Sequence, residues 1–517
     1  MNHKWMIVAA LVGALGCGDD ASSRWDEPLS LVGPIETVNG LAYIERSTSR
    51  VYTLDANRDG EKAILDIKTA TIGKQPGASA ASADGKSIFV VDEDREVLQI
   101  IDATDPSNIE EIELSGDFDR ITVDPYGEYV ILSFSGASDE NVVARNLNEI
   151  GVINLQGTKS ATFTTLSTRA NSFAFTKPFD LSGSAQRVMA VLSDNEVTIF
   201  DLLADNDEDR LREVPLTVSE ADALLVPQQV IFDTSKEDKL DLYIRTQNSD
   251  ISRVTVRLAP DGASRKLQLS TDKLTVDRPA AMEVLTLSNG STRLLTIAQN
   301  AARFTLVDTV SDVSVTLALP INNPAAFLVP FVTTVEEDGT LREEVRVIAY
   351  SPESSLVAVI RPELVPIEGD EPTVGRSVEA IRLDNLPERI EMSTSVPDQA
   401  IVFHPRSGFS LLNLQKNNDV PIQGGALRDV LFDGTFAYVV FQTLPNLTIF
   451  GNDGHPTNFD LPRNGTSVHF DQDSEVLIVP HSSNTGEFTV LNANDPRPEN
   501  ATVYQNVFLN DFFGREN

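Results

Sequence analysis

Cysteine is almost absent from this chain: Cys17 is the one cysteine in 517 residues. Disulfides therefore cannot stabilise the fold, and the protein must be held by its own buried core, which a chain of this length can form. One cysteine and five histidines, with no histidine pair at ligand spacing, also give no sign of a zinc site. Tryptophan is nearly as rare, since the sequence contains just Trp5 and Trp25.

Basic residues are scarce as well. The chain has 41 Lys and Arg against 77 Asp and Glu, and its net charge is −36. Nucleic acid binding needs clustered Lys and Arg that neutralise phosphates, so this charge excludes nucleic acid as a partner. Most of the carboxylates are expected to be solvated at turns and strand ends. They are too numerous for any two to be named as a catalytic pair.

Long apolar runs are missing apart from one, which extends from Trp5 to Leu15 behind Lys4 and ends in small residues before Cys17. A basic start, about eleven apolar residues and a small-residue end are typical of an export signal, and the run is too short to span a bilayer. An ordinary secretory signal with an incidental cysteine is the alternative to a lipoprotein signal.

The four residues Ala14-Leu15-Gly16-Cys17 resemble the lipobox of bacterial lipoproteins. This resemblance implies that residues 1–16 are a signal peptide and that Cys17 is lipidated and becomes the mature N-terminus. The expected location is then the cell envelope, at the outer membrane of a Gram-negative bacterium, on its periplasmic or its surface face. Residues 17–30 are small, polar and acidic, which predicts a flexible tether. The remaining residues, 31–517, form the folded domain.

Ten segments of this domain share one pattern, two short strands rich in Val, Ile, Phe and Tyr joined by a polar turn. In one of them the expected strands are residues 88–92 and 97–102. The ten segments are 41–55, 88–102, 129–155, 187–202, 240–258, 293–308, 345–360, 399–414, 436–450 and 475–491. Their mean separation of roughly 49 residues is within the range of propeller repeats.

Further strands flank these hairpins. A short strand ending in an Asp, Pro or Gly turn precedes several of them, for example at residues 121–127, and a fourth strand follows, for example at residues 109–114. Four consecutive antiparallel strands are a propeller blade, so we predict an all-β fold, a β-propeller of eight to ten four-stranded blades.

Alternatives remain at this point. A β-solenoid is the main rival to the propeller. Ten repeats could form one large wheel or two wheels, or include accessory hairpins. The ring could close by packing of the first and last blades, or by a strand at residues 29–32 added to the last blade.

Two turns resemble known propeller families. Residues 82–92, Ser-Ala-Asp-Gly-Lys-Ser-Ile-Phe-Val-Val-Asp, are similar to the Pro-Asp-Gly-x-x-hydrophobic pattern of the YVTN and lactonase-like propellers. Residues 101–108, Ile-Asp-Ala-Thr-Asp-Pro-Ser-Asn, resemble the Asp-x-Ser-x-Pro turn of LVIVD-type repeats. Quinoprotein-like propellers carry a Trp in each blade, and this chain departs from them because both tryptophans precede the repeats. The resemblance implies a propeller and no particular activity.

One segment has the spacing of a calcium loop. Asp55, Asn57 and Asp59 stand at positions one, three and five, Gly60 follows, and Asp66 is at position twelve. Calcium is therefore the one cofactor that the sequence suggests. The alternative is that Asp55 ends a strand and that residues 57–60 are a hairpin turn.

Catalysis has little support in the sequence. The histidines beyond the signal, His404, His455, His469 and His481, lie in no recognisable motif and are expected to be structural. We therefore expect a lipid-anchored propeller that binds or scaffolds a protein or glycan partner, and more readily a binding module than an enzyme. A lactonase-like or lyase-type enzyme with its site at the central channel is the main alternative. A structural surface protein is a third.

Overall fold

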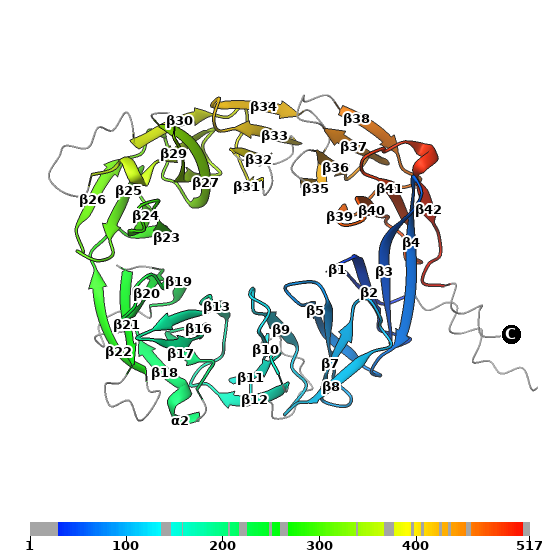
Figure 1. Cartoon of the computed structure of the whole chain (residues 1–517), viewed down its shortest axis with the longest axis horizontal. Coiled ribbons are helices and arrows are strands. Elements are labelled where there is room, and N and C mark those ends of the chain that lie inside the picture. Colours follow the sequence, from blue (N-terminus) through cyan, green and yellow to red (C-terminus); the bar gives the residue numbers. More distant parts are fainter. Residues whose placement is uncertain are drawn as a thin grey trace, which may run out of the picture.

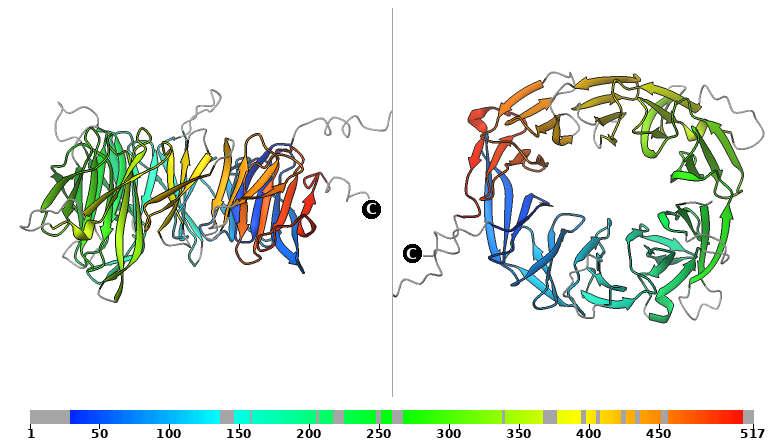
Figure 2. Two further views of the ribbon diagram at one scale, coloured as in Figure 1. Left: turned by 90° about the horizontal axis from the view of Figure 1, so that it is seen from above. Right: turned by 180° about the vertical axis from the view of Figure 1, so that it is seen from behind.

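The computed structural model describes residues 29–135, 146–157, 159–204, 207–216, 225–247, 251–258, 267–337, 340–366, 377–393, 398–404, 408–422, 426–432, 436–450 and 456–509. Ten four-stranded antiparallel sheets follow one another along the chain and form a closed ring (Figure 1). Seen from the side, the ring is flat relative to its width (Figure 2). The prediction of a β-propeller is confirmed, with ten blades in one wheel.

The first five blades share one order, in which strands succeed each other from the centre of the ring outward (Figure 1). They are β1–β4 (Leu31–Thr37, Gly40–Glu45, Arg50–Asp59, Lys62–Thr71), β5–β8 (Pro76–Ala81, Ser87–Asp92, Val97–Asp102, Ile109–Glu113), β9–β12 (Arg120–Val123, Tyr129–Ser133, Glu149–Asn154, Ser160–Thr165), β13 and β16–β18 (Ser172–Phe175, Val188–Leu192, Glu196–Asp201, Leu211–Pro215), and β19–β22 (Pro227–Asp233, Leu240–Thr246, Ile251–Leu258, Leu267–Leu274).

The other five blades repeat this order. They are β23–β26 (Pro279–Thr286, Thr292–Ala298, Arg303–Asp308, Ser314–Ala318), β27–β30 (Phe327–Glu337, Thr340–Tyr350, Leu356–Ile360, Val378–Arg382), β31–β34 (Arg389–Met392, Gln399–His404, Gly408–Asn413, Asn418–Ile422), β35–β38 (Leu427–Phe432, Ala437–Phe441, Asn446–Phe450, Pro456–Asp460), and β39–β42 (His469–Asp471, Val476–Pro480, Phe488–Asn492, Thr502–Tyr504).

Little lies outside the blades. A two-stranded hairpin, β14 (Phe179–Leu181) and β15 (Ser184–Gln186), is inserted in the fourth blade. The described helices are short: α2 (Asp207–Arg210), η1 (Pro362–Leu364) and η2 (Pro498–Asn500). No helix in the described residues is long and apolar enough to cross a membrane.

All ten hairpins expected from the sequence are the second and third strands of the ten blades. These strands are buried along most of their length, as in Ser87–Asp92 and Val97–Asp102. The reason is that neighbouring blades cover both faces of each sheet, so a middle strand needs apolar residues on both sides. Ten hydrophobic clusters of described residues result, and each contains side chains from two adjacent blades.

The ring closes by face packing of its first and last blades. Tyr43 and Tyr52 of the first blade contact the ring of Phe508, which follows β42, at centroid distances of 5.1 and 4.9 Å. The Tyr52 hydroxyl donates to the Phe508 carbonyl at 3.3 Å, and the Leu65 N–H donates to the Tyr504 hydroxyl at 2.8 Å. Strand β1 pairs with β2 of its own blade, so residues 29–32 do not complete the last sheet.

Candidate functional site

The segment with calcium-loop spacing lies in two paired strands, β3 and β4, which form a hairpin. Asp55 lies in β3 directly opposite Asp66 in β4, and Asn57 and Asp59 are exposed farther along β3. An extended strand rises by about 3.3 Å per residue, so Asp55 and Asp59 are about 13 Å apart along it. The ammonium group of Lys68 lies 2.8 Å from the Asp55 carboxylate and 3.6 Å from that of Asp66.

Within the described residues, no group of three His, Cys, Asp or Glu side chains is placed to hold a metal ion. Burial raises the pKa of Asp55, although Lys68 acts in the opposite direction. Calcium binding at Asp55, Asn57, Asp59 and Asp66 stays a prediction. Cys17, the predicted lipid site, lies outside the described residues.

The two faces of the ring offer different surfaces. We call the face where the inner strands begin and the second strands end the entry face, and the opposite one the exit face. On the entry face, blades five to seven enclose a cavity of about 460 Å³. Its lining is rich in amide groups and proline: Gln228, Arg245, Gln247, Pro279, Ala280, Gln299, Pro324, Ala325, Ala326, Ser351, Pro352 and Glu353.

The fold places the polar residues of this cavity at equivalent positions. Gln247, Gln299 and Ser351 each directly follow the second strand of their blade. The backbone N–H of Gln247 donates to the carbonyl of Val226, and that of Gln299 to the carbonyl of Arg278. These bonds tie each amide-bearing residue to the start of the inner strand. Consecutive blades therefore present side-chain amides around one opening.

Arg245 is the charged group of the cavity that lies deepest. Its Nε donates to the Gln229 side-chain carbonyl at 3.3 Å, and Gln229 donates in turn to the Met282 carbonyl of the next blade at 2.9 Å. Within the described residues no carboxylate lies within ion-pairing distance of Arg245. Burial accordingly lowers the pKa of its guanidinium. A half-buried cation beside amide donors is suited to a ligand with carboxylate, hydroxyl or carbonyl oxygens.

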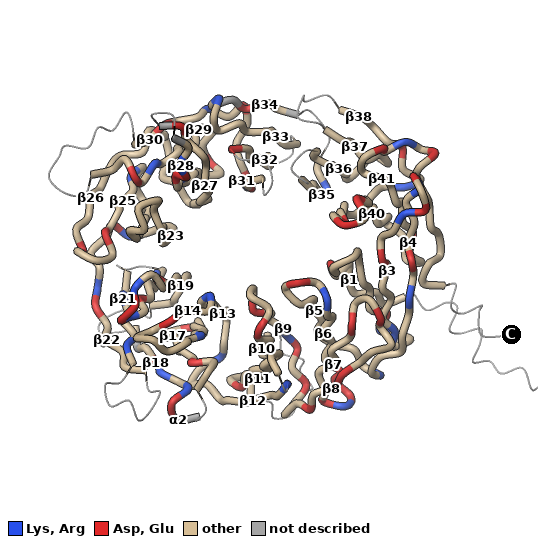
Figure 3. Tube along the Cα trace, in the orientation of Figure 1, with Lys and Arg blue, Asp and Glu red and all other residues tan. Residues whose placement is uncertain are grey.

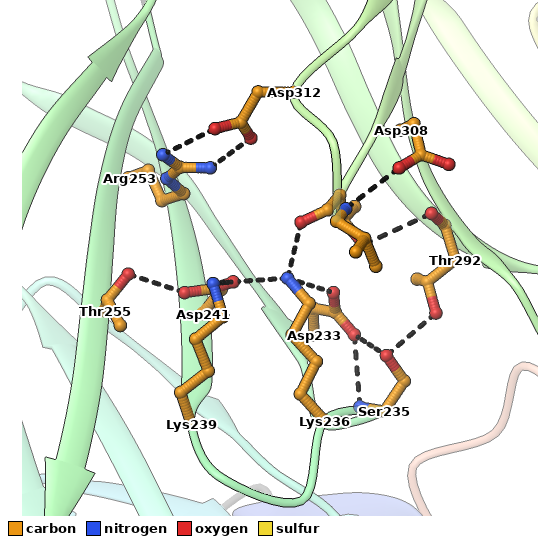
Figure 4. Close-up of polar contacts among 12 residues, drawn as sticks. Asp233, Ser235, Lys236, Lys239, Asp241, Arg253, Thr255, Thr292, Asp308 and Asp312 are labelled. Atoms are coloured by element: carbon orange, nitrogen blue, oxygen red, sulfur yellow. Dashed lines mark hydrogen bonds and ion pairs between the residues drawn. The ribbon is translucent and has the colours of Figure 1, made fainter. Parts of the chain in front are cut away.

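A second polar cluster, on the exit face, has a structural role instead (Figure 4). The Lys236 ammonium group donates to the Asp241 carboxylate and to the Thr309 carbonyl of the next blade, both at 2.6 Å. The Thr255 hydroxyl also donates to Asp241 at 2.6 Å. Burial raises the pKa of Asp241, but the hydrogen bonds from Lys236, Thr255 and Lys239 outweigh it and lower the pKa overall. Protein donors therefore already satisfy this carboxylate, and the cluster fastens blades five and six.

The histidines that the structure describes are hydrogen-bonded. His404 contacts the Leu386 carbonyl and the Ser410 hydroxyl, each at 2.9 Å, and His481 contacts the Thr489 hydroxyl at 2.7 Å. Both are buried, as expected for structural histidines. His469 is different, because one of its nitrogens meets a carboxylate of the first blade, Glu36. His455 lies outside the described residues.

Sequence reasoning missed Arg245 and the glutamines beside it. A signal for the glutamines exists, because a Gln stands directly after an apolar second strand in the triplets Thr-Gln-Asn 246–248, Ala-Gln-Asn 298–300 and Phe-Gln-Thr 441–443. Aligning the repeats with one another would have revealed it. Acidic residues gave no such signal, since they are spread around the whole ring (Figure 3).

Comparison with known proteins gives no family. No family model matches the chain, and no curated protein matches it. Among solved structures it is similar to dihydro-heme d1 dehydrogenase NirN in complex with DHE, with a TM-score of 0.38 and 9% identity over 93% of this chain and 80% of that one. It is also similar to apo AztD from Citrobacter koseri, with a TM-score of 0.33 and 11% identity over 73% of this chain and 95% of that one. A eukaryotic initiation factor has a TM-score of 0.40 and 11% identity, over 93% of this chain and 97% of that one. Likeness at this level says nothing about what this chain binds or does.

Proposed function

We propose that this protein is a lipid-anchored β-propeller of the cell envelope that acts as a binding or scaffolding module for a protein or glycan partner. The observation that carries the proposal is the cavity around Arg245, with a half-buried cation and amide groups from successive blades. Its volume of about 460 Å³ falls in the range of ligand sites. Because the ring already holds this cavity in shape, little conformational entropy is lost when a partner binds.

The Arg245 guanidinium sets the chemistry of the partner. Its half-buried positive charge has no carboxylate within ion-pairing distance among the residues that the structure describes, so a partner oxygen that accepts its hydrogen bonds would complete the site. Uronic acids, acetamido sugars and peptide carboxylates or carbonyls carry such oxygens. The resemblance to the YVTN, lactonase-like and LVIVD propellers supports the propeller fold. It does not favour one function, since propellers of one shape serve many functions.

Photo-crosslinking in cells tests the site. A benzophenone amino acid replaces Gln299 in the full-length protein, and a control protein carries it at Arg382, an exposed position of the outer strand β30. We expect a discrete adduct from position 299 and none from 382. Arg245→Ala should weaken the adduct about tenfold or more, because a hydrogen bond to a charged group contributes about 1.5–3 kcal/mol. Equal adduct yields from both positions, or an adduct yield from position 299 that Arg245→Ala leaves unchanged, would contradict the proposal.

Fractionation tests the anchor. If Cys17 carries the lipid, Cys17→Ser should block processing or move the protein from the membrane to the soluble fraction, because two or more acyl chains supply the membrane affinity. Metabolic labelling with an alkyne fatty acid should mark the parent protein and not the variant. Unchanged partition and processing of Cys17→Ser would leave the protein an ordinary secreted propeller.

A further inference from the structure

Three side chains at the ring closure are hydrogen-bonded in series. The Nδ1 atom of His469, in the inner strand β39 of the last blade, lies 2.9 Å from a carboxylate oxygen of Glu36. Glu36 belongs to β1, the inner strand of the first blade. The Nε2 atom of the same imidazole lies 2.8 Å from the hydroxyl oxygen of Ser467. Closure of the propeller thus joins residues from opposite ends of the chain into one chain of hydrogen bonds.

The chemistry of these groups fixes where the protons are. A carboxylate only accepts hydrogen bonds, so Nδ1 of His469 carries the hydrogen that faces Glu36. In the neutral imidazole, Nε2 is then a lone-pair acceptor, and the Ser467 hydroxyl is the donor to it. The hydrogen bond from His469 lowers the pKa of Glu36, which keeps that carboxylate ionised. A hydroxyl, a base and an orienting acid in this order are the arrangement that activates a serine nucleophile.

The backbone at Ser467 is also unusual. Gly465 pairs with His481 and His469 pairs with Ile478, so four residues on the inner side are matched by three on β40, which is a β-bulge. Such a bulge leaves its extra residue unpaired, and the N–H of Ser467 makes no hydrogen bond to any described residue. The N–H of a nucleophilic serine is a common donor to the oxyanion that forms during acyl transfer.

Space for a small substrate lies beside the acid and the base of this series, and the Ser467 hydroxyl oxygen is 2.8 Å from the base. His469 and Glu36 line a cavity of about 350 Å³ on the exit face, between the first and last blades. Ser467 is part-buried, whereas the buried Ser410 that bonds His404 is closed off from solvent. Asp471 and Asp473 line the same cavity and would repel an anionic substrate. An uncharged ester with a short acyl chain fits this environment.

We propose that Ser467, His469 and Glu36 form a hydrolytic site for small uncharged esters, separate from the Arg245 cavity and going beyond a binding role. Ser467 Oγ attacks the ester carbonyl carbon while its proton passes to His469 Nε2. The bond to the leaving alkoxy oxygen breaks, and that oxygen takes the proton and departs as the alcohol. Water attacks the acyl-serine by the same route, which releases the carboxylic acid and restores Ser467. Glu36 holds the imidazole and stabilises its charged form.

Hydrolysis of p-nitrophenyl acetate and butyrate by the full-length protein tests the site. Ser467→Ala should reduce the rate to that of buffer, and His469→Gln should reduce it about a hundredfold or more. Glu36→Gln should reduce the rate less, because the amide oxygen still accepts the hydrogen bond from His469 Nδ1 although it carries no charge.

Active-site labelling gives a second, independent readout. A fluorophosphonate should label Ser467 with one adduct per chain, found by mass spectrometry, and His469→Gln should abolish the label. Ser410→Ala is the matched control, because Ser410 bonds a histidine that faces the Leu386 carbonyl and, in the part of the chain that the structure describes, no carboxylate. It should leave both rate and label unchanged. Melting curves confirm that each variant is folded. Turnover that survives Ser467→Ala in the folded protein, or a folded parent without rate or label, would overturn the proposal.

Discussion

Arg187 shows how much one residue can contribute to a joint between blades. It directly precedes β16 in the fourth blade, is 1% exposed, and forms ion pairs with Asp124 and Glu128 of the third blade. Its guanidinium also lies 4.6 Å from the centre of the Tyr126 ring. Asp124 is fully buried, so its charge depends on this partner.

Replacing Arg187 should therefore be costly. Arg187→Met leaves the buried Asp124 carboxylate without its cation, and we expect the free energy of unfolding to fall by about 3–5 kcal/mol. The control is Arg389→Met, since Arg389 pairs with Glu391 at 3.1 Å where both side chains are more than half exposed. Arg389→Met should lower the free energy of unfolding by less than about 1 kcal/mol. Urea unfolding measures both, and equal losses would show that the buried pair contributes nothing special.

The sequence could not have identified such residues. Arg187 and Asp124 are 63 positions apart, and each separately looks like one more charge at a strand end. The same holds for the Ser467, His469 and Glu36 series, whose members come from the two ends of the chain. Ser467 and His469 are two positions apart, yet without Glu36 they carry no signal.

At the scale of elements, local sequence patterns predicted the strands correctly. The ten hairpins were predictable because a strand covered on both faces shows itself in a few consecutive apolar residues, and the turn residues beside it mark its ends. The Asp55–Asp66 segment shows what a local pattern leaves out, and calcium binding there stays a prediction. Its ligand-like spacing is local, but the long pairing of β3 with β4 keeps the segment extended and directs Asp55 toward Lys68.

Two glycine turns of the repeats can be tested as elements. Gly85 and Gly127 both adopt positive φ, at 69° and 77°, in the turn between the first and second strands of successive blades. A Cβ atom at Gly85 would lie 2.5 Å from the backbone nitrogen of Val38 in the neighbouring blade, whereas one at Gly127 would meet nothing nearer than 3.9 Å. The Val38 N–H also donates to the Gly85 carbonyl at 2.9 Å.

Gly85→Ala should thus destabilise the protein more than Gly127→Ala. Both variants carry the cost of positive φ, about 1 kcal/mol, but only Gly85→Ala also forces two blades apart. We expect a clearly larger drop in melting temperature for Gly85→Ala, and faster hydrogen exchange of the Val38 amide. Equal drops for the two variants would mean that the turn tolerates the shift and that the joint between the first two blades is compliant.

For the whole molecule, the closing joint differs from the other nine. Elsewhere the chain itself connects the two blades of a joint, so lost packing leaves them tethered. Between the first and last blades there is no such connection, and each sheet contains strands from its own blade alone. Ring integrity there depends on side chains such as Phe508, which is 1% exposed. The Ser467, His469 and Glu36 series crosses the same joint and can form only while the ring is closed.

Phe508→Ala should accordingly open the ring. Its lost burial and the remaining cavity cost about 3–5 kcal/mol, and Tyr43, Tyr52 and Phe488 lose their common partner. Phe118→Ala is the matched control, because Phe118 is equally buried and stacks on Phe134 at 4.8 Å in a joint that the chain bridges. Hydrogen exchange should accelerate across β1–β4 and β39–β42 in Phe508→Ala, and near the second and third blades alone in Phe118→Ala. If Phe508→Ala left exchange in the first and last blades unchanged, packing at Phe508 would not be what keeps the ring closed.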